Sequence, residues 1–116
     1  MTIGDTVSKI GRNIRYIFQD NQNNFWFASD GEGLFRYDGK TIFQLTDKNG
    51  LCGNFVRLIQ QGKDGSVFIS TENGVCMFNG KQFNTVQSAE SKFNTTDFTD
   101  MVLLSGNYYQ NNLLNQ

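Results

Sequence analysis

Residues 13–40 read NIRYIFQDNQNNFWFASDGEGLFRYDGK and decide the fold, because much of this pattern returns about 42 residues further along the chain. The matched positions are Gly11 with Gly53, Arg15 with Arg57, Ile17 with Ile59, Gln19 with Gln61, FWFAS at 25–29 with VFIST at 67–71 and, after the loss of one residue, GLFRYDGK at 33–40 with GVCMFNGK at 74–81. A tandem repeat of this period is typical of the four-stranded blades of propeller folds.

Each copy predicts four short antiparallel strands joined by tight turns. The expected strands are 14–20, 25–29, 34–37 and 40–45 in the first copy, and 55–61, 66–71, 74–78 and 82–86 in the second. Asp38-Gly39 is a strong hairpin signal, because both central residues of a type I′ turn need positive φ, and Asn79-Gly80 repeats it.

The expected strands are apolar on both alternating sets of residues. Ile14, Tyr16 and Phe18 point to one side of the first strand, while Ile17 lies on the other. In a sheet with one solvent-exposed face, apolar and polar residues alternate more regularly along each strand. Both faces of each sheet are therefore expected to be covered. Propeller blades meet this demand because each sheet lies between two neighbours, whereas a sandwich or small barrel would carry outward polar residues at every second position.

The predicted fold class is therefore all-β, with two four-stranded antiparallel blades and a partial or divergent C-terminal strand segment. We divide the chain into a lead-in at 1–12, blade 1 at 13–45, an inter-blade loop at 46–54, blade 2 at 55–86, and a divergent or truncated third repeat with a tail at 87–116. The predicted structural core includes Trp26 and Phe27 of the first copy and Phe68 and Ile69 of the second.

Charge and hydropathy exclude several functional classes. The formal net charge is -1 and no run of Lys or Arg is longer than one residue, so neither nucleic acid nor an anionic membrane is an expected partner. No stretch is long and apolar enough to span a bilayer, and the N-terminus lacks the apolar run of a secretory signal.

Catalytic chemistry has little support in the sequence. The chain contains no His, which excludes imidazole relays and imidazole metal ligands, and its carboxylates are dispersed among turns. Asp47-Lys48-Asn49-Gly50 lacks the further ligands of a calcium loop. Cys52 and Cys76 show neither metal-type nor redox-type spacing, and Cys76 is expected to be a buried structural thiol. We therefore expect no enzyme, no metal and no cofactor.

The two copies resemble the two-component regulator propeller repeat, which recurs in the extracytoplasmic sensor regions of bacterial hybrid histidine kinases. The matching residues are Ile14, Ile17, Gln19-Asp20, Trp26-Phe27-Ala28-Ser29, Gly33-Leu34 and Arg36-Tyr37-Asp38-Gly39 in the first copy, and Gly50-Leu51, Asn54, Val56, Ile59, Asp64-Gly65, Phe68-Ile69-Ser70-Thr71, Gly74-Val75 and Phe78-Asn79-Gly80 in the second. Blade 2 departs from the pattern at Phe68, where the family has Trp, and at Gly62, where it has Asp.

The resemblance implies a non-catalytic scaffold that binds a ligand or a partner, with glycan-derived ligands in the family and a periplasmic or other extracytoplasmic location. Propeller ligands usually meet the loops that join outer to inner strands and second to third strands. The candidate ligand-binding residues are therefore Asp30, Glu32, Asn54, Glu72 and Asn73, for which the alternative is a solvated turn residue. Trp26 invites a sugar-stacking role, but packing between blades is the stronger interpretation.

Two blades do not close a propeller, so further blades in the same or another chain are expected partners. Three arrangements follow: the chain is part of a longer signalling sensor, copies of it close into a ring, or its C-terminal segment caps the open face. The leading functional prediction is a ligand-sensing or interaction module of a bacterial two-component sensor. The alternative is a stand-alone structural protein that oligomerises through its blades into a closed ring.

Overall fold

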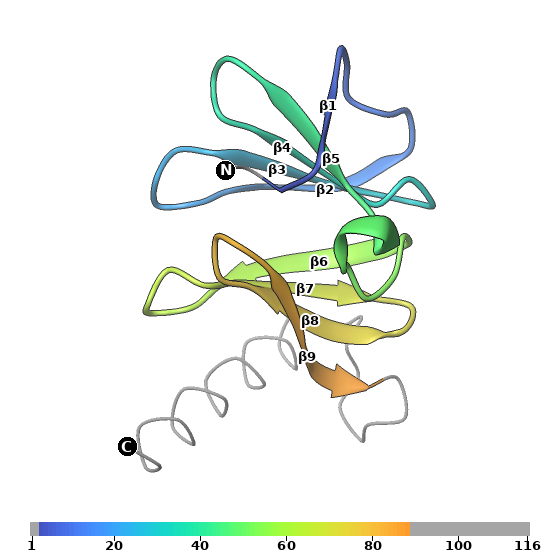
Figure 1. Cartoon of the computed structure of the whole chain (residues 1–116), viewed down its shortest axis with the longest axis vertical. Helices are drawn as coiled ribbons and strands as arrows, with labels where there is room; N and C mark the ends of the chain where they lie inside the picture. The colour runs from blue at the N-terminus through green and yellow to red at the C-terminus, as the bar shows by residue number, and fades with distance from the viewer. Residues whose placement is uncertain (1–2, 89–116) are drawn as a thin grey trace.

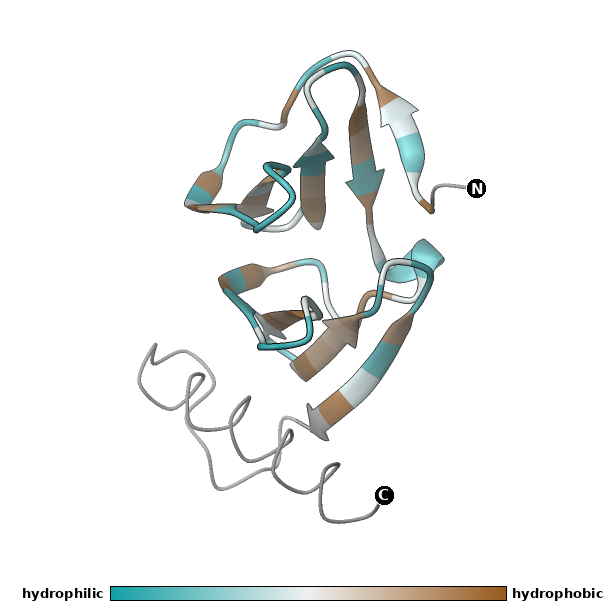
Figure 2. Ribbon diagram, turned by 90° about the vertical axis from the view of Figure 1, so that its left-hand side faces the viewer, coloured by the Kyte–Doolittle hydropathy of each residue, from teal (hydrophilic) through white to brown (hydrophobic). Residues whose placement is uncertain are grey.

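A computed structural model describes residues 3–88 and shows two antiparallel sheets stacked as layers (Figures 1 and 2). The strands are β1 (Asp5–Val7), β2 (Ile14–Gln19), β3 (Phe25–Ser29), β4 (Leu34–Tyr37), β5 (Ile42–Leu45), β6 (Val56–Gln61), β7 (Val67–Thr71), β8 (Gly74–Phe78) and β9 (Phe83–Ser88). A three-residue 3₁₀ helix, η1 (Asp47–Asn49), lies between the sheets in sequence. The all-β prediction is confirmed.

The strand order follows the repeat. The first sheet, blade 1, has the order β1-β5-β4-β3-β2, and the second, blade 2, has the order β6-β7-β8-β9. The lead-in supplies β1, a fifth strand that pairs with the outer strand β5 from Asp5 opposite Gln44 to Val7 opposite Ile42. The same bulge occurs in both first strands, between Ile14 and Tyr16 in β2 and between Val56 and Leu58 in β6.

The core lies between the two blades. Its buried members are Trp26, Ala28, Leu34 and Leu45 of blade 1, Leu51 of the inter-blade loop, and Val56, Ile59, Val67, Ile69, Cys76 and Phe78 of blade 2. Because side chains alternate across a strand, these residues come from one pleat set of each sheet. The rings of Trp26 and Phe78 meet in a T-shaped arrangement across the interface, with the ring centroids 5.7 Å apart.

The opposite pleat sets point away from this interface. In blade 2, Phe68 and Val75 are fully buried and cluster with Met77, apart from the interblade core. In blade 1, Phe27 is half-buried on the side facing away from blade 2. Of the four residues predicted for the core, Trp26 and Ile69 lie between the blades, whereas Phe68 and Phe27 lie on the far faces of their sheets.

The Asp38-Gly39 hairpin forms, but its turn is not type I′. Only Gly39 has positive φ, at 99°, and the connection spans residues 38–41. The Asp38 carboxylate accepts hydrogen bonds from the backbone N–H groups of Thr41 and Lys40, at 2.8 and 2.9 Å, and these bonds lower the pKa of Asp38. Asn79 accepts the equivalent pair in blade 2. A side-chain acceptor at the first turn position thus replaces the second residue with positive φ.

Asp20 organises the turn between β2 and β3. Its carboxylate accepts hydrogen bonds from Trp26 Nε1 at 2.8 Å, from the backbone N–H groups of Gln22 and Asn24, and from Asn24 Nδ2. Burial alone would raise the pKa of Asp20, but these four bonds outweigh it and hold the pKa below its usual 3.8. Blade 2 has Gly62 and Phe68 at the two positions, so the acceptor is absent where the indole donor is absent.

The predicted third repeat at 87–116 lies outside the described residues apart from the end of β9. Over residues 3–88, no helix has the length and apolar character that crossing a bilayer requires.

Replacing Asp20 by Ala is expected to lower the free energy of unfolding at pH 7 by about 1–3 kcal/mol, because the buried Trp26 N–H loses its acceptor. The pKa of Asp20 is lower in the folded than in the unfolded chain, so its contribution is present above the unfolded value and is lost as pH falls through the folded one. Denaturant titrations from pH 7 to pH 2 should show the difference from wild type shrinking below about pH 3.8. The exposed Asp5, replaced by Ala, is the control, and a difference that stays constant with pH contradicts the assignment.

Candidate functional site

The structure places the five candidate ligand residues along one end of the two blades, which we call the loop edge. It consists of the β3–β4 turn with Asp30 and Glu32, the β7–β8 turn with Glu72 and Asn73, and Asn54 of the inter-blade loop. In Figure 1 these three segments lie on the right-hand side. Asp30 forms an isolated antiparallel bridge with Phe55, which joins the two blades here.

Asn54 connects three segments of the loop edge. Its carbonyl oxygen accepts hydrogen bonds from the backbone N–H groups of Gly31 and Gly33, at 3.1 and 2.9 Å. Its side-chain oxygen accepts from the N–H of Asp47 at 2.9 Å, at the start of η1. Asn73 adds a bond from Nδ2 to the carbonyl oxygen of Cys52, 3.1 Å away. These contacts hold the inter-blade loop against both blades.

Glu32 and Glu72 play the same part in the two repeats. Glu32 Oε1 accepts from the N–H of Arg12 at 3.3 Å, and Glu72 Oε1 accepts from the N–H of Phe55 at 3.3 Å. Each carboxylate lies beside a glycine, Gly11 or Gly53, where an added Cβ would collide with it. Each therefore fastens the segment that leads into the first strand of its own blade.

The remaining candidate, Asp30, makes a looser contact. Its Oδ1 lies 3.9 Å from Nη1 of Arg15, and both side chains are about half exposed, so the pair contributes little to stability. The arginine repeated at 57 has a buried Nε for which the described residues provide no hydrogen-bond partner. The loop edge is thus a continuous polar network whose hydrogen bonds are mainly internal, with exposed carboxylates at Asp30, Glu32 and Glu72.

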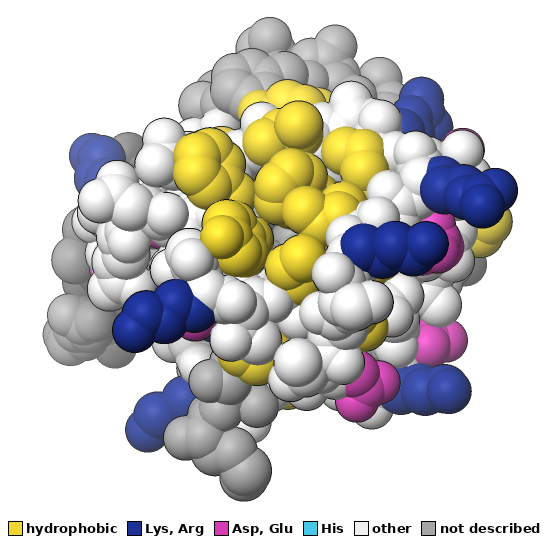
Figure 3. Space-filling view, turned by 90° about the horizontal axis from the view of Figure 1, so that it is seen from above, with side chains coloured by type: hydrophobic (Ala, Val, Ile, Leu, Met, Phe, Trp, Pro, Cys, Tyr) yellow, Lys and Arg dark blue, Asp and Glu magenta, His cyan; other side chains and the backbone are white. Residues whose placement is uncertain are grey.

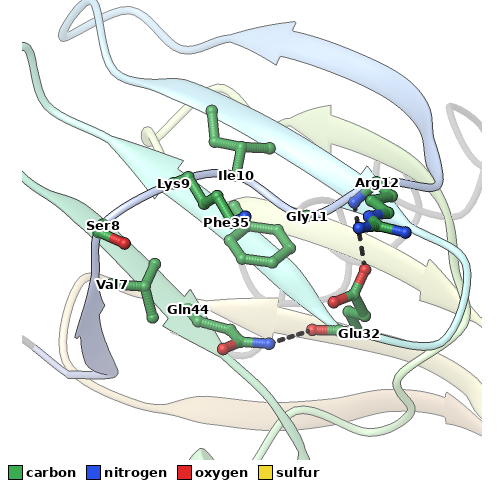
Figure 4. A pocket seen from close by; sticks show the side chains of 9 residues that line it. All are labelled: Val7, Ser8, Lys9, Ile10, Gly11, Arg12, Glu32, Phe35 and Gln44. Carbon is green, nitrogen blue, oxygen red and sulfur yellow. Dashed lines mark hydrogen bonds between the residues drawn. The ribbon is translucent and has the colours of Figure 1, made fainter.

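A pocket of about 320 Å³ lies beneath the lead-in segment on blade 1 (Figure 4). Its lining comprises Val7, Ser8, Lys9, Ile10, Gly11, Arg12, Glu32, Phe35 and Gln44. Gln44 Nε2 donates to the carbonyl oxygen of Glu32 at 2.9 Å, which closes one side. Sequence reasoning found only Glu32 of this set. The sequence signal that could have identified the other lining residues is the repeat itself. Residues 8–12 are the equivalents of 50–54, which cross blade 2 in the same way.

A second pocket, of about 220 Å³, lies between the blades at the opposite end from the loop edge. Asp20, Trp26, Arg36, Gln61 and Phe78 are among its lining residues. The Arg36 guanidinium lies 5.2 Å from the Trp26 ring centroid and 5.9 Å from that of Phe78, within cation–π range. Gln61 joins the blades here by accepting from the N–H of Asn21 at 2.9 Å. Trp26 is 1% exposed, which leaves its ring without a free face for a sugar.

The outer face of blade 1 is only partly covered. Its members are Ile17, Phe25, Phe27, Phe35, Tyr37 and Ile42, which the strand register places on the side away from blade 2, and Phe35 among them is buried beneath the lead-in segment. Ile17 is 57% exposed and Phe25 is 38% exposed. Figure 3 shows hydrophobic side chains gathered on this side of the molecule.

The repeat shows what such a face does elsewhere in the chain. The equivalents of the outer-face residues in blade 2 are Ile59, Val67, Ile69, Cys76, Phe78 and Phe83, in the same order. Cross-strand pairs agree, since Phe27 opposes Phe35 as Ile69 opposes Cys76, and Tyr37 opposes Ile42 as Phe78 opposes Phe83. In blade 2 this whole set packs against blade 1 in the interblade core. The partly covered face is therefore the counterpart of a buried one.

Two stacked sheets with this strand order and repeated register define the chain as a protein of propeller-type blades. The family model described as two component regulator propeller matches residues 8–31, from the lead-in to the β3–β4 turn. This match confirms the resemblance drawn from the sequence. A search of curated proteins finds no significant match. Among the described residues, no group of three or more His, Cys, Asp or Glu side chains is placed to hold a metal ion.

Replacing Glu72 by Ala is expected to lower the free energy of unfolding by about 0.5–1.5 kcal/mol, because the N–H of Phe55 loses its acceptor. Thermal and denaturant unfolding measure this effect, and Lys63→Ala, at an exposed turn position of the same blade, is the control. An unchanged free energy of unfolding would show that the hydrogen bond of Glu72 does not stabilise the fold.

Proposed function

We propose that the chain is a non-catalytic propeller module of a two-component sensor protein and that it works by interaction, with the outer face of blade 1 as the seat of a further blade. One observation supports this proposal above the others. A face with Ile17 and Phe25 exposed is the repeat counterpart of the face that blade 2 buries against blade 1.

The outer face of blade 1 should bind a blade through a surface equivalent to the Trp26 side of blade 1. Blade 1 presents Phe18, Trp26, Arg36 and Phe43 to blade 2, paired in that order across its strands. By the same geometry, a blade on the outer face would present its own equivalents of these four residues. The occupant is thus a blade of the same repeat, stacked in the same direction.

The occupant that we propose is a blade in another segment of a longer polypeptide. A ring of copies of this chain is the alternative, in which blade 2 of one copy would stack on the outer face of blade 1 of the next. Light scattering gives a direct check, because a ring has a multiple of the 13.2 kDa chain mass.

The sensing part of the proposal concerns the loop edge. Exposed carboxylates at Asp30, Glu32 and Glu72 lie beside the joint between the blades, where a bound ligand would touch both. A glycan-derived ligand is the class that the family resemblance favours. A glycan array probed with this chain is expected to give binding that Asp30→Ala reduces severalfold and Lys63→Ala leaves unchanged, and an array without binders would remove this part.

The seat itself can be tested by duplicating residues 8–49 in tandem, which adds one blade in register before blade 1. The original Ile17 should then be buried. We expect Ile17→Glu at this inner copy to cost about 1.5–3 kcal/mol or more of unfolding free energy. In the chain without duplication, where Ile17 is 57% exposed, the same change should stay within about 0.5 kcal/mol.

Phe55→Glu is the matched control, since Phe55 is 46% exposed but lies outside the outer face. Its effect should be equal in the two chains. Equal effects of Ile17→Glu in the two chains would mean that the added blade does not cover this face, and the proposed seat would be wrong.

A further inference from the structure

The fold brings together two cysteines whose spacing in the sequence gave no sign of contact. Cys52 lies in the inter-blade loop just before β6, and Cys76 lies in the middle of β8. The backbone N–H of Cys52 donates to Sγ of Cys76 at 3.4 Å, so the two residues are in contact. Both cysteines are free.

The backbone on both sides fixes this contact. Asn73 Nδ2 holds the carbonyl oxygen of Cys52, and the Cys52 thiol lies 3.5 Å from Thr71 Oγ1 and 3.8 Å from the carbonyl oxygen of Gly74. Gly53 follows Cys52 with Glu72 packed closely against it, at a position where a Cβ would collide with the carboxylate. The Cys52 sulfur thus lies against β7 and β8, at Thr71 and Gly74.

The first repeat supports the same geometry. Ile10 and Phe35 are the equivalents of Cys52 and Cys76, and both line the pocket beneath the lead-in (Figure 4). The segment before each first strand therefore crosses the third strand of its blade, and the two positions line one pocket in blade 1 and are in contact in blade 2. An apolar pair fills this place in blade 1, and a pair of thiols fills it in blade 2.

The two thiols differ in reactivity. The hydrogen bond from the Cys76 thiol lowers the pKa of Cys52, against the opposing effect of burial. The same hydrogen bond, together with burial, raises the pKa of Cys76. Cys52 is also the more accessible of the two, since it is half-buried whereas Cys76 is 1% exposed. The thiolate is the reacting form of cysteine, so Cys52 is suited to attack and Cys76 to follow.

We propose that Cys52 and Cys76 form a reversible disulfide, a redox modification site that fastens the inter-blade loop to the third strand of blade 2. The oxidant is a low-molecular-weight disulfide. The Cys52 thiolate attacks one of its sulfurs, and the other sulfur leaves with the bonding electron pair and takes up a proton. Cys76 then loses its proton and attacks Sγ of Cys52, which releases the second small thiol. One small disulfide is reduced to two thiols as the two cysteines are oxidised.

The bond would act on the joint between the blades. It joins two residues that are 24 positions apart in the sequence, and the loop it closes contains β6, β7 and the β7–β8 turn. Cys52 lies two residues before Asn54, whose carbonyl oxygen accepts from Gly31 and Gly33 of blade 1. Oxidation would therefore fix the segment that holds the blades together, and it would reduce the freedom of the unfolded chain.

The test uses the full chain, oxidised glutathione as the probe, alkylation of the remaining thiols, and mass spectrometry. We expect wild type to end as an internal Cys52–Cys76 disulfide, two hydrogens lighter and without bound glutathione, and its Tm to rise by roughly 10 °C until dithiothreitol reverses it. Cys76→Ser should stop at a glutathione adduct on Cys52, and Cys52→Ser should react at least tenfold more slowly.

Two results would overturn the proposal. One is a stable glutathione adduct on the wild-type chain, which means that Cys76 does not reach the mixed disulfide. The other is no reaction in the folded chain while the chain in denaturant oxidises, which means that both thiols are inert in the fold. Because wild type itself is measured, neither result depends on a variant that fails to fold.

Discussion

The structure depends on the burial of one apolar sheet face against another. Blade 1 contributes Trp26, Leu34 and Leu45 to the interface, and blade 2 contributes Ile59, Ile69 and Phe78, all nearly or fully buried. Burial of such side chains stabilises by about 1.5–3 kcal/mol each, which makes this interface the main source of stability. The same sheets are also apolar on their other faces. Stacking two blades therefore buries one face of each sheet but leaves Ile17 and Phe25 of blade 1 exposed. The exposed apolar side chains on blade 1 are thus a consequence of how the blades are held together.

Two differences between the copies involve two positions that change together. Asp20 with Trp26 becomes Gly62 with Phe68, so the buried indole donor and its acceptor are both absent from blade 2. Ile10 with Phe35 becomes Cys52 with Cys76, two small side chains in place of two large ones. A single change in either pair would leave an unpaired polar group or a cavity, both of which cost stability. When both residues of a pair change together, the fold is kept while the chemical character of the pair changes.

The blade strands could be predicted because each copy carries its own alternation and turn residues, and a second copy in register removes ambiguity. The pairing of β1 with β5 could not, since Asp5–Val7 contains one apolar residue and the partner lies far along the chain. The turn at Asp38 differs from the predicted type I′ turn because the Asp38 carboxylate accepts a hydrogen bond from the backbone of Thr41. The Asp-Gly dipeptide alone does not predict this bond. Loop positions identified Glu32 and Glu72 as edge residues, but their bonds to Arg12 and Phe55 depend on how the lead-in segments cross the blades. The same crossing, and not the sequence spacing, brings Cys52 to Cys76.

The inter-blade loop makes hydrogen bonds to both blades. Through Asn54 it binds the β3–β4 turn of blade 1, and through Cys52 and Phe55 it binds the β7–β8 turn of blade 2. These bonds are polar and lie at the edge of the molecule, so they contribute less than the buried core but set how the blades are aligned. A ligand at the loop edge or a bond between the cysteines would act on the same few residues. Either event would change the alignment of the blades and so affect the outer face of blade 1. The β3–β4 turn that the loop binds contains Glu32 and Gly33, and Phe35 of the outer face lies two residues after Gly33.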